Sequence, residues 1–227
     1  LDAIGYAVCH QIPGRSFFLA ERQLPLCARC SGMYLGAWVG FLYLFGKNKL
    51  GGMPARTALI PLVVLAILFI VDGINSYLTF FNPNPPLYQP ENWLRLLTGS
   101  GLGLGIAAFL VPTFNQTVWI DVQLHPALGS WKPVVSMMIA ALLANLAVLS
   151  NNPLLIYPFA ILSGLSVLLV LSLAYTLVWV LVTRRENTFQ SWKQVRWHLL
   201  AGLCTAMLQI TLIDLARFAA TGTWAGF

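Results

Sequence analysis

The residues best suited to chemistry lie close together near the start of the chain, between positions 9 and 30. They are Cys9, His10, Cys27 and Cys30. The Cys27-x-x-Cys30 spacing places two thiols on one helical turn, and Pro25 favours a helix that begins just ahead of them. The positive end of the helix dipole, with Arg29 beside it, favours thiolate over thiol. Because the thiolate is the form that binds metal ions and attacks disulfides, this spacing indicates metal or redox chemistry.

Three interpretations of this Cys/His segment are open. All four side chains could bind zinc in a closed tetrahedral site that holds residues 1–26 against the helices. Cys27 and Cys30 could instead form a redox pair with Cys9 as the exchanging third thiol, or two of the three could form a structural disulfide on an oxidising outer face. Adjacent Cys9 and His10 are awkward as ligands of one ion, so His10 could hydrogen-bond within the site instead.

The composition is that of a membrane protein. Hydrophobic residues make up 58% of the 227 residues and charged residues 9%, against about 25% charged in ordinary globular chains. The mean hydropathy is +0.76. So few charges cannot cover the surface of a soluble protein, so we expect the lipid bilayer as partner. We therefore expect the net charge of +6 to indicate which loops of the membrane protein face the cytoplasm. No nucleic-acid partner is expected.

Six apolar runs are long enough to cross a bilayer, which needs roughly 20 residues per helix. They are about 27–46, 57–81, 92–112, 134–150, 154–183 and 197–220. The fold class is therefore all-α, a polytopic membrane protein of about six transmembrane helices within residues 27–220. Residues 1–26 form an extramembrane Cys/His segment and residues 221–227 a C-terminal tail.

Basic residues concentrate in two predicted loops, 47–56 and 184–196, which lie on the same side of a six-helix chain. The loops on the other side contain no lysine or arginine. By the positive-inside rule the basic loops are cytoplasmic. The N-terminal Cys/His segment is then outside, on the outer face of a prokaryotic plasma (inner) membrane.

Four ionisable residues fall within the predicted spans, in their outer third: Asp72, Arg95, Asp214 and Arg217. Charges at membrane depth are costly and are candidates for function. They could form two structural ion pairs, Asp72 with Arg95 and Asp214 with Arg217. The alternative is that they line a polar pocket in the outer leaflet together with Cys27 and Cys30.

Small residues predict which helices touch. Glycine recurs every four residues over 32–40 and every two residues over 99–105. Such faces let helix backbones approach closely in lipid. We therefore expect the helices at 27–46 and 92–112 to pack together.

Two stretches carry a resemblance to a known family. They are Cys-His-Gln-Ile-Pro-Gly-Arg-Ser-Phe-Phe from Cys9 and Arg-Gln-Leu-Pro-Leu-Cys-Ala-Arg-Cys-Ser-Gly-Met-Tyr from Arg22. They resemble the signature of an uncharacterised prokaryotic membrane-protein family, domain of unknown function family 2085, over about residues 6–110. Val71-Asp72-Gly73 and the run from Arg95 to Gly99 resemble its later motifs. The resemblance implies a multi-pass membrane protein with this motif and carries no established activity.

Three functions follow from these observations. The first is a non-catalytic membrane protein whose outer Cys/His site binds a metal ion such as zinc, as a structural site that could belong to a larger membrane complex. The alternative is an enzyme, a thiol-disulfide oxidoreductase that uses Cys27-x-x-Cys30 and passes electrons to a quinone. The third is a small-solute transporter whose path includes the outer charges.

Overall fold

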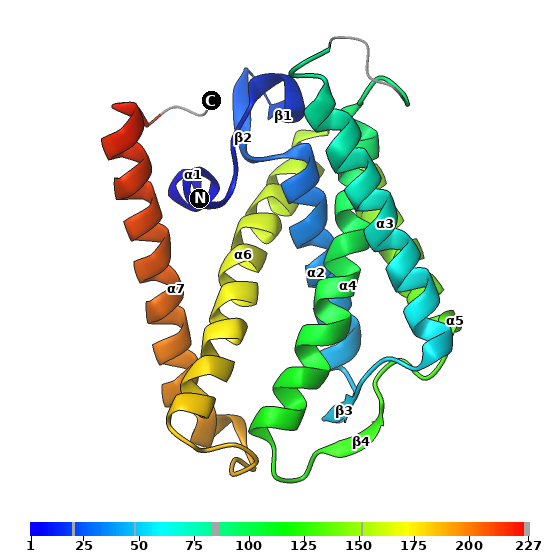
Figure 1. Ribbon diagram of the computed structural model, residues 1–227, viewed down its shortest axis with the longest axis vertical. Coiled ribbons are helices and arrows are strands. Elements are labelled where there is room, and N and C mark those ends of the chain that lie inside the picture. The colour runs from blue at the N-terminus through cyan, green and yellow to red at the C-terminus, as the bar shows by residue number, and fades with distance from the viewer. Residues whose placement is uncertain (20, 48, 83–86, 151, 225–227) are drawn as a thin grey trace.

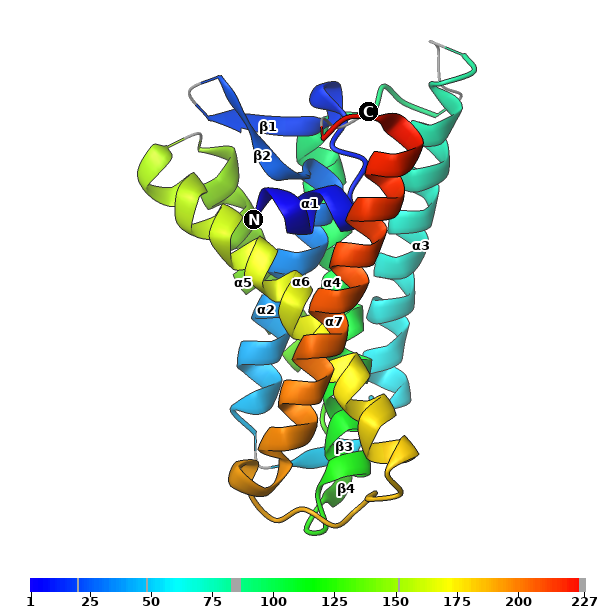
Figure 2. The ribbon, with the colours of Figure 1, turned by 90° about the vertical axis from the view of Figure 1, so that its left-hand side faces the viewer.

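The computed structural model describes residues 1–19, 21–47, 49–82, 87–150 and 152–224. Six long helices run between two ends of the molecule (Figures 1 and 2). They are α2 (Ala28–Phe45), α3 (Arg56–Leu78), α4 (Asn92–Val118), α5 (Trp131–Leu149), α6 (Pro153–Val182) and α7 (Trp192–Thr221). We call the end that carries Cys27 the motif end and the opposite end, which carries Lys49, the basic end.

Five of these helices, α3 to α7, are long and apolar enough to cross a membrane by length and composition. In α3 only 17% of the most apolar stretch is buried within the protein, against 61% in α4. Apolar side chains directed outward need lipid around them, which places α3 at the lipid boundary and α4 in the centre. The predicted class, an all-α membrane protein, is confirmed. The predicted span 27–46 corresponds to α2, an 18-residue helix.

Three proline residues lie inside helices of the bundle. The predicted run 92–112 stops at Pro112, whereas α4 continues to Val118. Pro61 and Pro158 likewise lie inside α3 and α6. Helices in membranes tolerate proline because neighbouring groups satisfy the freed backbone carbonyls.

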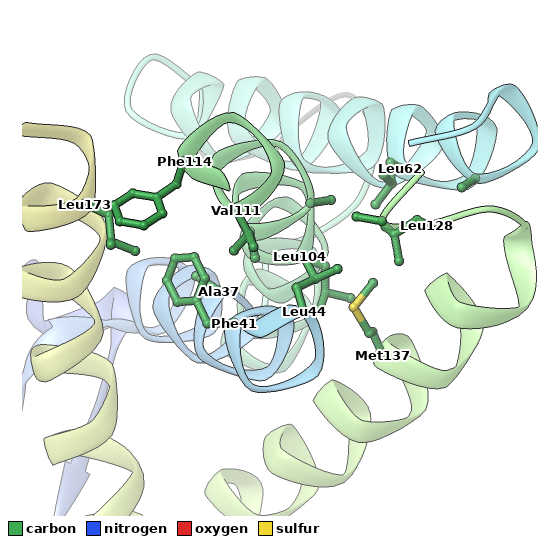
Figure 3. Packing of buried hydrophobic residues seen from close by; sticks show 14 of the residues in the cluster. Ala37, Phe41, Leu44, Leu62, Leu104, Val111, Phe114, Leu128, Met137 and Leu173 are labelled. Atoms are coloured by element: carbon green, nitrogen blue, oxygen red, sulfur yellow. The ribbon is translucent and has the colours of Figure 1, made fainter. Parts of the chain in front are cut away.

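The centre of the bundle is the contact between α2 and α4, as the glycine spacing predicts. A Cβ atom on Gly99 would lie against the backbone of Arg29 and Met33, and one on Gly103 against Met33 and Ala37. The bare glycine face therefore lets the two backbones touch. Figure 3 shows the apolar core that continues this contact, formed by Phe41 and Leu44 of α2, Val111 and Phe114 of α4, and Leu62, Met137 and Leu173 from the surrounding helices.

We expect Gly103→Ala to lower the free energy of unfolding by about 1–3 kcal/mol, because the added methyl group meets backbone atoms of α2 that cannot move aside. Gly105→Ala is the matched control, since no atom lies within 4 Å of a Cβ at that position. Unfolding of the two variants in mixed detergent micelles measures the difference. Equal stabilities would show that α2 and α4 are not held this closely.

At the basic end, three connections that the sequence places on one side meet one another. Lys49 donates hydrogen bonds to Asp121 at 2.7 Å and to the carbonyl of Gln190 at 2.8 Å. Strand β3 (Leu50–Gly52) pairs in parallel with β4 (Gln123–Pro126). The basic loops 47–56 and 184–196 therefore lie at the same end, opposite the Cys/His segment.

The first 27 residues form a small folded unit at the motif end. It consists of α1 (Asp2–Val8), a 3-10 turn η1 (Pro13–Arg15) and the hairpin β1 (Ser16–Leu19) and β2 (Arg22–Cys27). Figure 2 shows α1 lying across α6 and α7, with the hairpin above it. Cys27 ends β2 directly before α2, so this unit and the helix bundle meet at the cysteine motif.

Candidate metal centre

Three cysteine sulfurs converge from three parts of the chain. Cys9 follows the end of α1, Cys27 ends β2 and Cys30 lies in the first turn of α2. Their Sγ atoms lie about 3.3–3.8 Å from one another. Cys9 is buried, while Cys27 and Cys30 are half-buried, and all three are free thiols. This group could hold a metal ion.

The sulfur of Cys9 accepts hydrogen bonds from the loop after α1 and from the end of β2. The backbone N–H groups of Gln11 and Cys27 donate to Cys9 Sγ at 3.4 and 3.2 Å. Gln11 adopts a φ of 53°, a left-handed conformation that residues other than glycine rarely take. Its side-chain amide donates to the carbonyl of Pro25 at 2.9 Å, which fixes this loop against β2. Backbone strain of this kind persists where the surrounding structure imposes it, often at functional sites.

Hydrogen bonding distributes the charge of the cluster unequally. The thiols of Cys30 and Cys9 donate to Cys27 and, with the backbone N–H groups at the start of α2, lower its pKa well below the usual range. The pKa of Cys9 is raised to about 11, chiefly because its proton is held in the bond to Cys27. A divalent cation that binds here would displace the protons of Cys9 and Cys30 and leave three thiolates, since metal binding to cysteines releases protons.

The spacing of the sulfurs suits tetrahedral coordination. Zn–S bonds of about 2.3 Å at tetrahedral angles place the sulfurs about 3.8 Å apart, the upper end of the separation in this cluster. His10, the fourth predicted ligand, is exposed and does not belong to the group formed by the three sulfurs. It lines a pocket that also reaches Cys27 and Cys30, and its role as fourth ligand stays a prediction.

The predicted pairing of Asp72 with Arg95 is wrong, because Asp72 forms its ion pair with Arg29. The carboxylate is 1% exposed and also accepts hydrogen bonds from the Tyr88 hydroxyl at 2.8 Å and from Thr98 at 3.3 Å. Arg29 lies in the first turn of α2, and its guanidinium reaches across to the Asp72 carboxylate on α3. Arg95 instead donates to the side chain of its neighbour Asn92 at 2.8 Å.

Arg217 fastens the Cys/His segment to α7. Its guanidinium donates to the carbonyls of Tyr6 at 2.5 Å, Cys9 at 2.8 Å and His10 at 3.5 Å, at the C-terminal end of α1. Asp214 is buried on the same helix. Asp72 and Arg95 lie on α3 and α4, and Asp214 and Arg217 on α7. Figure 1 shows α7 apart from α3 and α4, so the four predicted intramembrane charges divide between two places.

Arg15 and Tyr88 belong to this end of the molecule although the sequence did not single them out. The guanidinium of Arg15 donates to the Ser76 carbonyl at 2.9 Å and to Thr79 at 3.1 Å, which ties η1 to α3. The only signal for Arg15 was its place in the Pro-Gly-Arg-Ser motif. Tyr88 lies in the connection between α3 and α4, where no pattern marks it.

The Tyr88 contact predicts a loss of stability at high pH. Burial, together with the hydrogen bond to Asp72, raises the pKa of Tyr88 from 10.0 to about 12. The folded protein then holds this proton more tightly than the unfolded chain does, so the contribution is full below pH 10 and falls as pH rises towards 12. We expect the melting temperature of Tyr88→Phe to fall less over that interval than that of the wild type. If the melting temperatures of the variant and the wild type fall equally with rising pH, the contact of Tyr88 with Asp72 is contradicted.

Known proteins share this motif region. The family model described as "Predicted membrane protein (DUF2085)" matches residues 9–109. An uncharacterized protein of Methanothermobacter thermautotrophicus is 35% identical over 100 residues, which cover 44% of this chain and 81% of its own length. The uncharacterized protein MJ1492 of Methanocaldococcus jannaschii is 29% identical over 119 residues, 52% of this chain and 71% of its own length. No solved structure matches the chain.

The shared stretch contains Cys9, Cys27 and Cys30 with Arg29 and Asp72, and it ends within α4. It therefore holds the whole sulfur cluster, the ion pair beside it and the helices α2 and α3. A family match over these residues, with an archaeal relative covered over four fifths of its length, makes this chain a member of the DUF2085 family of predicted membrane proteins.

Proposed function

We propose that Cys9, Cys27 and Cys30 bind one zinc ion, which fastens the first 27 residues to the helix bundle. The observation that carries this proposal is the meeting of three sulfurs from α1, β2 and α2 at the spacing of a thiolate-zinc centre. Three thiolates form a soft ligand set that suits zinc better than magnesium or calcium. His10 is the proposed fourth ligand from within the chain.

A structural role fits the way the surrounding residues are arranged. Cys9 is 4% exposed, and its loop is held by Gln11 on one side and by Arg217 on the other. α1 has 7 residues, too few to be stable as an isolated helix. A metal that joins its C-terminal end to α2 supplies the missing stability, as in other small metal-bound units.

Hydrogen–deuterium exchange with and without a strong chelator tests this role. Removal of the metal is expected to speed exchange in residues 1–27 by at least about tenfold, because the segment loses its attachment to α2. Residues 119–130 at the basic end serve as the internal control and should not change. Equal exchange in the metal-loaded and stripped protein would show that the site does not fasten the segment.

We also propose that the motif end faces the outside and that the basic loops lie in the cytoplasm of a prokaryotic cell. The charge of loops 47–56 and 184–196 supports this orientation. Arg184 and Arg185 are exposed, so trypsin should cut there in inverted membrane vesicles and not in intact spheroplasts. Cleavage in intact spheroplasts and not in inverted vesicles would overturn this orientation.

Assembly into a larger membrane complex stays a prediction, which cross-linking in native membranes tests.

A thiol-disulfide oxidoreductase is the second candidate, favoured by the thiolate of Cys27 with two thiols in contact. Oxidation of the Cys27 thiolate and the Cys30 thiol to a disulfide would release two electrons and one proton. A quinone would accept these together with a second proton from water as it becomes a quinol. An apolar groove of about 450 Å³ between α3, α4 and α5 could admit such a molecule. Trapping of a mixed disulfide in Cys30→Ser supports this function, and the lack of any reducible disulfide excludes it.

A further inference from the structure

Three arginines converge on one buried serine beside the cysteine cluster. Ser76, which is fully buried on α3, accepts hydrogen bonds from Arg15 through its carbonyl and from Arg29 and Arg95 through its hydroxyl, at 2.9, 3.0 and 3.5 Å. The three guanidinium groups come from η1, α2 and α4. They therefore meet although they lie far apart in the chain.

The charge of this arginine cluster is not balanced. Asp72 is the one carboxylate that forms an ion pair with it among the described residues. Mutual repulsion is evident at Arg15, whose pKa is lowered by burial and by the nearby charge of Arg29. The three guanidinium groups therefore carry more positive charge than this one carboxylate balances, so like charges are held together without a full set of partners.

A pocket of about 280 Å³ opens onto all three arginines. Arg29 Nε is buried with no hydrogen-bond partner among the described residues. Arg29 Nη1 would lie 3.7 Å from a Cβ at Gly73, which also lines the pocket. Each guanidinium carries five N–H donors, and its hydrogen bonds to the described residues use only part of them. Donors therefore remain for a ligand in the pocket.

The outer wall of the pocket is aromatic. Tyr77 and Phe80 line it, and both side chains are exposed at the end of α3. Exposed aromatic rings at the end of a membrane helix mark the level of the lipid headgroups. The pocket thus opens at the depth where phosphate groups of the bilayer lie.

We propose that this pocket binds a phosphate group between Arg15, Arg29 and Arg95. Guanidinium groups bind phosphate through two parallel N–H···O bonds, and their fixed fork matches phosphate geometry better than a lysine does. A phosphate group is negatively charged, which suits a cluster whose positive charge exceeds that of its one paired carboxylate. The phosphate comes either from an anionic lipid headgroup or from solution. Cys27 and Cys30 line the same pocket, but the three arginines that bind the phosphate are not the proposed metal ligands.

Melting curves in maltoside detergent, which carries no phosphate, test the proposal. Three probes are compared: dihexanoyl phosphatidylglycerol, inorganic phosphate, and the neutral dihexanoylglycerol. We expect phosphatidylglycerol to raise the melting temperature in a saturable manner. If it acts alone the site takes a lipid headgroup, and if inorganic phosphate acts as well the site takes phosphate from solution. Stabilisation by neither, or equally by the neutral lipid, overturns the proposal.

Arg15→Gln is expected to weaken binding by about tenfold or more, the usual effect of removing a charged hydrogen bond. Arg22→Gln is the matched control, because Arg22 is exposed at the same end and pairs with Asp2 outside the pocket. Gly73→Val keeps every charge and fills the pocket, and it should weaken binding as well. An equal effect of Arg22→Gln and Arg15→Gln, or unchanged binding in Gly73→Val, contradicts the proposal. Metal content of the same samples separates this outcome from failure of the cysteine site.

Discussion

Cys27→Ser is expected to lower the zinc affinity of the purified protein by more than about a hundredfold. Residues that only orient metal ligands already contribute 10–100-fold, and Cys27 supplies a sulfur together with the negative charge of the cluster. Because metal binding and folding are coupled, the melting temperature should fall as well. Zinc titration against a competing chelator measures the affinity.

Cys204→Ser is the matched control for this change. Cys204 lies exposed on α7, away from the three converging cysteines. The same substitution there should leave both zinc affinity and melting temperature unchanged. If Cys27→Ser and Cys204→Ser behave alike, Cys27 is not a ligand.

Asp72→Asn is expected to lower the free energy of unfolding by about 3 kcal/mol. Removing one partner of a buried ion pair leaves the other charge buried and uncompensated. Asp72 is 1% exposed and the Arg29 side chain 21%, so solvent screens this pair only weakly. Unfolding by SDS in mixed micelles measures the loss.

Asp121→Asn removes a carboxylate of the same kind from the opposite end of the bundle. The Asp121 side chain is 59% exposed beside Lys49, and exposed pairs contribute little. This variant should be as stable as the wild type. A loss in Asp72→Asn no larger than in this control would contradict a structural ion pair between α2 and α3.

The sequence predicts what depends on composition and on local spacing. Five of the six apolar runs correspond to helices long and apolar enough to cross a membrane, because burial in lipid requires about 20 apolar residues in succession. The sixth, 27–46, corresponds to α2, which is not among these five. The contact of α2 with α4 follows from glycines at helical spacing, which leave a bare face whatever the partner. The Cys27-x-x-Cys30 spacing correctly places both cysteines at the start of a helix, but the prediction that Pro25 lies in its first turn is wrong, because Pro25 and Cys27 belong to β2 and α2 begins at Ala28.

Contacts that depend on how helices rotate about their axes could not be predicted. A common depth and opposite charge predict a pair of Asp72 with Arg95, but depth does not say which way a side chain points. Rotation of α2 brings Arg29 to Asp72, while Arg217 reaches α1 instead of remaining within its own helix. The fold of residues 1–27 was missed because α1 and the hairpin are too short to leave a periodic pattern.

Elemental analysis of the purified wild-type protein, with X-ray absorption at the metal edge, tests the central claim most directly. The account predicts about one zinc ion per chain, with three sulfur neighbours at about 2.3 Å. Less than about a tenth of an equivalent of zinc, iron or copper per chain, in protein purified without chelators, would contradict it.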